Sequence, residues 1–136
     1  MISKNANALL FICAVLLSSC TTYHISTQSL MQQLANTQKE KKVNVLFVPP
    51  LFFPGVVNGN NLRELKCLDE QDKEHVIRVT NHTGIRITKK DNTRCTFYFD
   101  TLLLKDSTIN GAKSHFLGLS IKPIKLDDIS KMELQQ

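Results

Sequence analysis

The sequence predicts a mainly β fold, namely a small antiparallel barrel or sandwich preceded by one short N-terminal helix. From residue 62 onward, short segments rich in β-branched and aromatic residues recur, and Asn, Asp and Gly residues typical of turns separate them. Residues 85–89 and 94–100 also alternate apolar with polar side chains, which is the period of a strand with one buried face. The chain of 136 residues is long enough for one domain, and its length beyond the first segment is too short for two.

A single helix is predicted over residues 29–40. Ser29 can cap its first free amide groups, and Gln32 three residues later would complete a capping box. Leu30, Met31 and Leu34 form a thin apolar stripe at helical spacing. A helix with so little apolar area is expected to pack on the domain rather than to insert into lipid.

The most hydrophobic segment after residue 20 covers residues 43–55. Residues 43–48 predict a buried strand that Pro49 and Pro50 end, because proline lacks the amide donor that a strand ladder needs. Leu51, Phe52 and Phe53 are then expected in a loop. We favour a role for them as a plug at one end of the barrel; the alternative is a membrane-dipping loop or a partner-binding surface.

The rest of the chain is expected to form short strands joined by turns. The expected strands cover residues 62–68, 76–80, 85–89, 94–100, 102–104, 116–126 and 132–134. The expected turns or loops cover residues 56–61, 81–84, 90–93, 106–111 and 127–129. Pro123 lies within the strand expected at 116–126, so that strand should be at a sheet edge or contain a bulge.

The first twenty residues have the layout of an export signal. Residues 1–7 are polar and include Lys4, residues 8–17 are uninterruptedly apolar, and two serines then precede Cys20. Because crossing the core of a bilayer takes about 20 apolar residues, this run of half that length does not predict a permanent transmembrane helix.

The sequence Leu17-Ser18-Ser19-Cys20 resembles the lipobox of bacterial lipoproteins. That resemblance implies cleavage between Ser19 and Cys20 and acylation of Cys20 by chains such as palmitate. It divides the protein into a signal peptide (1–19), a lipidated tether (20–28) and a β-rich domain with its helix (29–136). Two or three acyl chains hold a protein stably on a membrane. Thr21 differs from the Asp that retains some lipoproteins in the inner membrane, so the resemblance implies the outer membrane, facing the periplasm.

Two cysteines, Cys67 and Cys95, remain in the predicted domain. Both fall on expected strands and share the parity of apolar neighbours. Export would permit a disulfide between them, and the alternative is two buried thiols that act as small hydrophobic side chains.

The sequence contains no pattern that identifies a reaction. The net charge of +5 is scattered along the chain, without the clustered cations of a nucleic-acid surface. The four histidines, which we expect to be exposed and incidental, show no metal-ligand spacing. Asp127 and Asp128 are interpreted as a turn, and no Gly-x-Ser-x-Gly motif occurs. We therefore predict no catalytic residue, no metal ligand, no cofactor and no enzymatic activity.

These observations favour a lipid-anchored cell-envelope protein that acts as a structural or protein-interaction module, with an envelope protein as possible partner. The alternative is a carrier of a small apolar ligand; an envelope enzyme is the least favoured class. A carrier would line a barrel interior with Phe97, Phe99, Leu103 and Phe116. A cavity of at least about 300 Å³ would favour the carrier, whereas a solid core would favour the interaction module.

Overall fold

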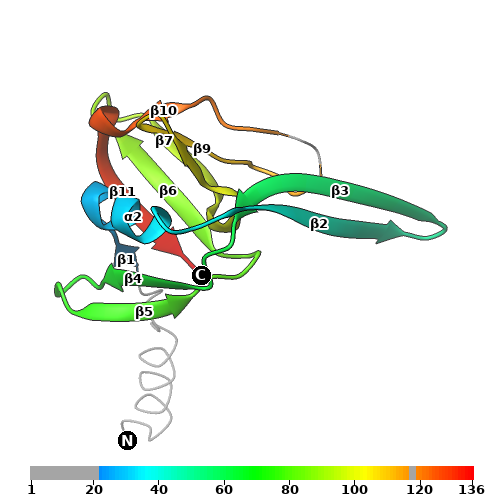
Figure 1. The fold of residues 1–136 in the computed structure, drawn as a ribbon, viewed down its shortest axis with the longest axis horizontal. Coiled ribbons are helices and arrows are strands. Elements are labelled where there is room, and N and C mark those ends of the chain that lie inside the picture. Colours follow the sequence, from blue (N-terminus) through cyan, green and yellow to red (C-terminus); the bar gives the residue numbers. More distant parts are fainter. Residues whose placement is uncertain (1–21, 117–118) are drawn as a thin grey trace, which may run out of the picture.

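The computed structural model describes residues 22–116 and 119–136, without the side chains of residues 42–47 and 53. Ser19 and Cys20, on which the predicted cleavage and lipidation fall, therefore lie outside the described residues. The predicted mainly β fold is confirmed: antiparallel strands form three sheets, and the described residues contain one α-helix (Figure 1). The sheets do not close into a barrel, so the arrangement is sandwich-like.

The largest sheet has six strands in the order β5-β4-β1-β11-β6-β7. Their bounds are β5 Glu74–Arg78, β4 Glu64–Leu68, β1 Tyr23–His24, β11 Ile129–Gln135, β6 Gly84–Lys89 and β7 Arg94–Tyr98. All neighbouring pairs are antiparallel. The C-terminal strand β11 thus occupies a central position and joins the two hairpins β4–β5 and β6–β7 through β1 and β6.

Two smaller sheets complete the β structure. One has the order β10-β9-β8, with β10 Ile124–Lys125, β9 Thr108–Asn110 and β8 Leu103–Lys105. The other is a hairpin of β2 Lys39–Val48 and β3 Leu51–Asn60. Two 3₁₀ turns, η1 Phe99–Thr101 and η2 Leu126–Asp128, join β7 to β8 and β10 to β11.

The hydrophobic core lies between the six-stranded sheet, the helix and the three-stranded sheet. Its fully buried large side chains are Leu30, Leu65, Ile85, Ile87, Phe99, Leu102, Ile109 and Leu134. They come from every layer, so the core is one continuous cluster. Alternate burial along β4 and β6 follows from the period of two of a strand with one buried face.

The helix α2 covers Thr27–Leu34 and begins earlier than predicted. Its cap is Ser26, whose hydroxyl accepts a hydrogen bond from the amide of Ser29 at 3.1 Å, so the expected cap at Ser29 is wrong. The expected stripe is partly right, because Leu30 and Leu34 are buried while Met31 is exposed. The helix ends at Leu34, and its C-cap Ala35 donates its amide hydrogen to the carbonyl oxygen of Met31.

Four further expectations are wrong. Residues 51–53 and 56–61 are not loops, since β3 covers nearly all of both and pairs with β2 along its length despite the prolines. Of the strand expected at 116–126, the described residues 116 and 119–126 form only β10 and an isolated bridge at Ser120. The turn expected at 106–111 is shorter, because Asp106 and Ser107 take positive φ angles and β9 follows at once.

Part of the expected tether belongs to the folded domain. Tyr23 pairs with Leu134 and His24 with Leu68, and Ile25 is buried in the core. Because Ser26 then caps α2, residues 23–28 are all within the fold. In the sequence, only Thr21 and Thr22 separate Cys20 from the first residue of β1.

Candidate functional site: the projecting hairpin

The β2–β3 hairpin projects from the body of the domain (Figure 1). Its ten pairs run from Lys39 opposite Asn60 to Val48 opposite Leu51, and Pro49 and Pro50 connect the strands. The sheet of this hairpin contains only β2 and β3 among the described strands. An isolated two-stranded hairpin is at best marginally stable in water, so its root must be held by the domain.

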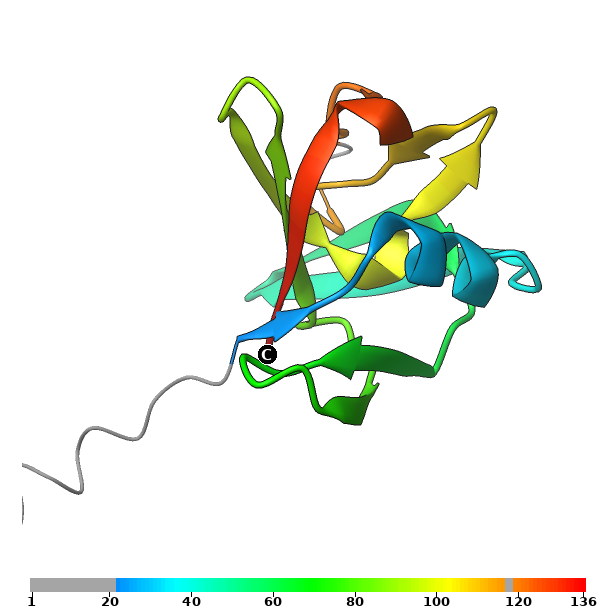
Figure 2. The same cartoon turned by 90° about the vertical axis from the view of Figure 1, so that its left-hand side faces the viewer.

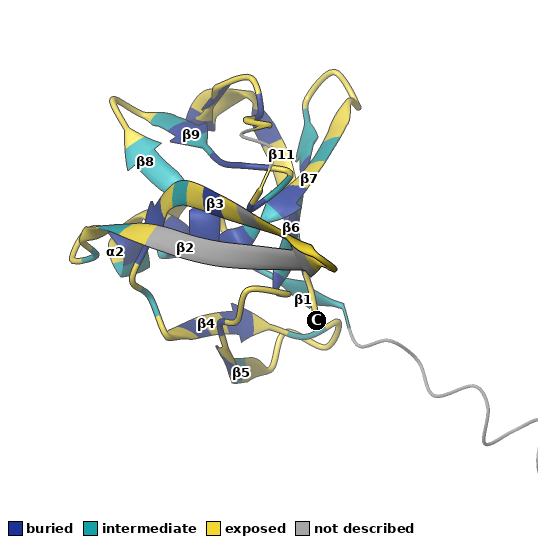
Figure 3. Ribbon diagram, turned by 90° about the vertical axis from the view of Figure 1, so that its right-hand side faces the viewer, coloured by how far each residue is buried: buried dark blue, intermediate teal, exposed yellow. Residues whose placement is uncertain are grey.

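The end of the hairpin is apolar and exposed (Figure 3). We call residues 48–54 the hairpin tip. Val48 is 49% exposed, Leu51 57% and Phe52 69%. Successive residues of a strand point to opposite faces, so the tip exposes apolar side chains on both faces of the ribbon. For Leu51 and Phe52 the predicted plug is therefore wrong, and the alternative of an exposed apolar surface describes them better; the side chain of Phe53 lies outside the described residues.

Asn60 fixes the root of the hairpin to the core. Its side chain is buried, and its amide nitrogen donates to the carbonyl oxygens of Phe99 and Leu102, each at 2.9 Å. Its side-chain oxygen accepts from the amide of Leu62 at 3.1 Å. The buried side-chain amide of Asn60 thus joins the end of β3 to Phe99 at the start of η1, to Leu102 just after η1, and to Leu62.

Gly55 forms the second attachment, where β3 lies against residues 115 and 116. A Cβ at Gly55 would lie 2.4 Å from the carbonyl oxygen of His115 and 2.7 Å from the Cα of Phe116. Both neighbours are backbone atoms, so only glycine allows this approach. The hairpin therefore leaves the domain at Gly55, and the part nearer the tip extends beyond that contact.

A buried ion-pair geometry holds the segment under Gly55. The Nε2 atom of His115 lies 2.9 and 3.0 Å from the two carboxylate oxygens of Asp100, and both side chains are buried. The imidazole also packs on the ring of Tyr98, with centroids 4.2 Å apart. The expectation that all histidines are exposed is thus wrong for His115. We interpret the pair as structural, since Asp100 lies in η1, which Asn60 also contacts.

The other histidines lie elsewhere. His82 is exposed as expected, whereas His75 is half-buried and its Nε2 lies 2.7 Å from Asp69. His24 is half-buried in β1, and its Nδ1 atom has no hydrogen-bond partner in the described part of the chain. No cluster of three or more His, Cys, Asp and Glu side chains with metal-binding geometry occurs among residues 22–116 and 119–136.

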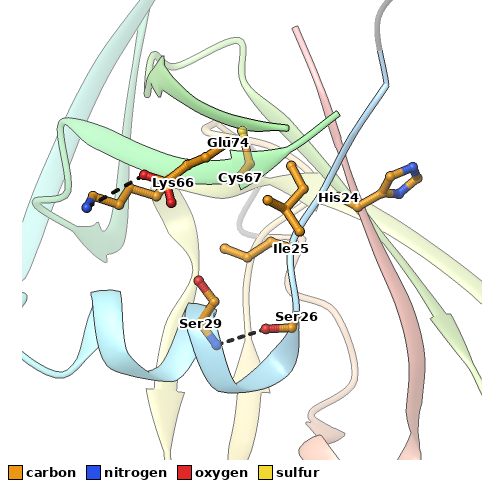
Figure 4. Close-up of a pocket in the computed structure, with 8 residues that line it drawn as sticks. His24, Ile25, Ser26, Ser29, Lys66, Cys67 and Glu74 are labelled. Carbon is orange, nitrogen blue, oxygen red and sulfur yellow. Dashed lines mark hydrogen bonds and ion pairs between the residues drawn. The ribbon is translucent and has the colours of Figure 1, made fainter. Parts of the chain in front are cut away.

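The two cysteines are free thiols in the structure, so the possible disulfide is not formed. Cys67 lies on β4 and Cys95 on β7, with three strands between them in the sheet, whereas a disulfide needs Cα atoms within about 7 Å. Burial raises the pKa of the Cys67 thiol. Cys67 lines a cavity of about 120 Å³ between the start of α2 and β4 (Figure 4), which is smaller than ordinary ligand pockets of about 300–1,000 Å³.

The residues expected to line a carrier interior are not brought together. Phe97 and Phe99 are part of the solid core, and Phe116 is exposed. Leu103 instead lines an open groove of about 480 Å³ between the end of α2 and β8. Its lining includes Leu34, Leu102, Leu103 and Leu104, together with Lys39 and Lys105.

Sequence reasoning missed Asn60, Gly55 and the pairing of Asp100 with His115. Asn60 lies in an Asn-rich stretch that is typical of a turn, and nothing local distinguishes a buried amide from an exposed one. The Asp100–His115 contact joins residues fifteen positions apart, so only the fold reveals it.

A search of the described residues finds no helix long and apolar enough to span a membrane. Comparison of the chain with family models, curated proteins and solved structures finds no match.

Proposed function

We propose that this protein is a lipid-anchored component of the bacterial cell envelope, in the outer membrane facing the periplasm, and that it acts as a structural or interaction module. The exposed apolar hairpin tip carries the proposal. Val48, Leu51 and Phe52 stand on a ribbon outside the core, and such uncovered apolar surface is typical of a contact site. The lipid on Cys20 would hold this contact site at a membrane surface.

The proposal is tested by fractionation of cells that express the Cys20→Ser variant. The protein with the parent sequence should be recovered with membranes, and its intact mass should include the attached lipid. The Cys20→Ser variant should lack the lipid mass and leave the membrane fraction. Cys95→Ser is the matched control, because Cys95 lies on β7 and its replacement should leave fractionation unchanged. A Cys20→Ser chain that stays wholly with membranes without its lipid would contradict the proposal.

A second candidate function is transport of a small amphiphile in the groove beside β8. The leucines give this groove an apolar lining, and the exposed Lys39 and Lys105 suit an anionic headgroup. Equilibrium binding of a long-chain fatty acid tests it. Saturable binding that Leu104→Asp abolishes and Leu119→Asp retains would support the carrier, whereas no binding at ligand solubility would contradict it.

A further inference from the structure

We propose that the hairpin tip, residues 48–54, inserts into the same bilayer that holds the lipid on Cys20. The lipid bilayer is then the partner of the tip, and the protein contacts its membrane at two separate points. This inference rests on the proposed lipid anchor and identifies what the exposed tip contacts.

The two-sided apolar character of the tip favours lipid over a protein surface. Val48 and Leu51 are opposite each other at the end of the ribbon, and Phe52 follows on the other face. A flat protein surface would cover one face of the ribbon and leave the other in water, whereas the acyl chains of a bilayer can contact the side chains of both faces. Insertion into lipid therefore removes more of the exposed apolar area from water.

The prolines of the tip act in the same direction. Pro49, Pro50 and Pro54 have no amide hydrogen, so the tip carries fewer backbone donors. In lipid, every donor without a partner is costly, and removing donors lowers the cost of insertion. The same prolines prevent regular pairing with a further strand, which disfavours sheet extension by a second copy or by a partner peptide.

The length of the free ribbon suits one leaflet. About four residue pairs lie beyond Gly55, which at a strand rise of about 3.3 Å per residue gives roughly 13 Å. Half the hydrocarbon core of a bilayer is about 15 Å thick. The ribbon is therefore too short to cross the membrane. Because open sheet edges are not tolerated in the hydrocarbon core, the apolar side chains of the tip enter the near leaflet while the ribbon backbone stays at the headgroup boundary.

The position of the anchor supports the same arrangement. The hairpin tip and the start of β1 lie at the same edge of the domain in Figures 2 and 3, but toward opposite ends of its long axis in Figure 1. Cys20 precedes Tyr23 by three residues, a span of at most about 10 Å. If that shared edge faces the bilayer, the lipid on Cys20 and the hairpin tip would contact the membrane at two well-separated points and fix the orientation of the domain.

The small size of the tip also favours lipid. A stable complex between two soluble proteins uses about 20–30 residues on each side, many more than the tip provides. An anchored protein needs no such area, because the lipid already holds the tip at the bilayer surface and makes its insertion an intramolecular event. The tip then adds to the affinity of the acyl chains and fixes the orientation of the domain.

The chain contains no tryptophan, so a single introduced Trp reports its own surroundings. We would purify the lipidated full-length product as Phe52→Trp and reconstitute it in vesicles of phosphatidylethanolamine and phosphatidylglycerol. The Trp emission should shift to the blue, and lipids brominated in their acyl chains should quench it. Val76→Trp on β5 is the matched control, since Val76 is also more than half exposed; its emission should stay that of Trp in water.

Co-flotation of each variant with the vesicles shows separately whether the anchor holds, so failure of the anchor and failure of the tip are distinguishable. Floated Phe52→Trp with water-like, unquenched emission would overturn the inference. A blue shift that disappears when the protein is diluted in excess lipid would assign the contact to a second copy and would also overturn it. Leu51→Trp repeats the measurement and guards against a local effect of replacing Phe52.

Discussion

Replacing Asn60 should destabilise the domain far more than an ordinary substitution on the hairpin. Asn60→Ala removes the two hydrogen bonds donated to the Phe99 and Leu102 carbonyls and the one accepted from the Leu62 amide. Each such bond contributes about 1 kcal/mol net, so we expect a loss of about 3 kcal/mol in the free energy of unfolding. With a urea m-value of about 2 kcal/mol/M, the unfolding midpoint should fall by roughly 1.5 M.

The Asn60→Asp variant separates the hydrogen bonds from side-chain volume. Asp keeps the oxygen that accepts from Leu62 but turns a carboxylate oxygen toward two carbonyl oxygens. Because the charged form is buried and repelled, the pKa of the new carboxyl should be raised in the folded state. Asn60→Asp should therefore be the less stable variant at pH 7 and should regain stability relative to Asn60→Ala as the pH falls and the carboxyl becomes a donor.

The assay is equilibrium urea unfolding followed by circular dichroism, with all variants expressed from residue 20 in a Cys20→Ser background so that lipid does not contribute. Asn58→Ala is the control, because Asn58 is exposed on the same strand and its replacement should change stability by less than about 0.5 kcal/mol. An Asn60→Ala protein as stable as Asn58→Ala would refute the role of this amide as the attachment of the hairpin.

Three further predictions concern the rest of the domain. Gly55→Ala should destabilise the domain or displace the hairpin, because the added Cβ would overlap backbone atoms of residues 115 and 116. Gly84→Ala should be tolerated, because the nearest atoms to its added Cβ are 3.7 Å away. The thermal unfolding temperatures of the two variants measure the difference. A hydrogen bond from Lys131 and the charge of Arg86 lower the pKa of Glu133 in the folded state. The carboxylate should therefore stabilise the fold above the usual pKa of 4.5, and this stabilisation should be lost as the pH falls below 4.5. A Glu133→Gln protein with the same acid unfolding profile as the parent would contradict this. Without prior reduction, Cys95 should react with iodoacetamide faster than Cys67, because Cys67 is buried and its thiol pKa is raised. Mass spectrometry measures the labelling, and two cysteines that stay unlabelled even in the unfolded chain would indicate a disulfide instead.

The strand pattern of the sequence predicted much of the six-stranded sheet and little of the smaller ones. Residues 85–89 coincide closely with β6 because one face is buried and the other is in solvent, which produces clean alternation. Residues 116–126 are equally apolar, but among the described residues of this range only Ile121, Ile124 and Leu126 are buried and only β10 is a strand. Periodicity cannot separate these two cases, since it records apolar character and not backbone pairing.

The hairpin shows a different limit of sequence reasoning. Its apolar residues and prolines indicate a buried strand followed by a loop if every apolar run is assumed to enter a core. The structure instead has a ribbon with β3 running through Pro54 to Asn60. Local sequence identified the unusual segment and offered exposure as an alternative, but whether the domain covers it depends on the contacts of Gly55 and Asn60 far along the chain.

Those contacts also bear on the proposed membrane contact of the apolar tip. The root of the hairpin is held by the buried amide of Asn60 and by the close backbone approach at Gly55, and neither attachment uses the side chains of Val48, Leu51 or Phe52. Polar residues at these exposed positions would satisfy the fold equally well and would lower the risk of aggregation. The apolar character of the tip is therefore not explained by the stability of the domain. A contact that removes both faces of the ribbon from water does explain it, and an anchored domain has a bilayer within reach.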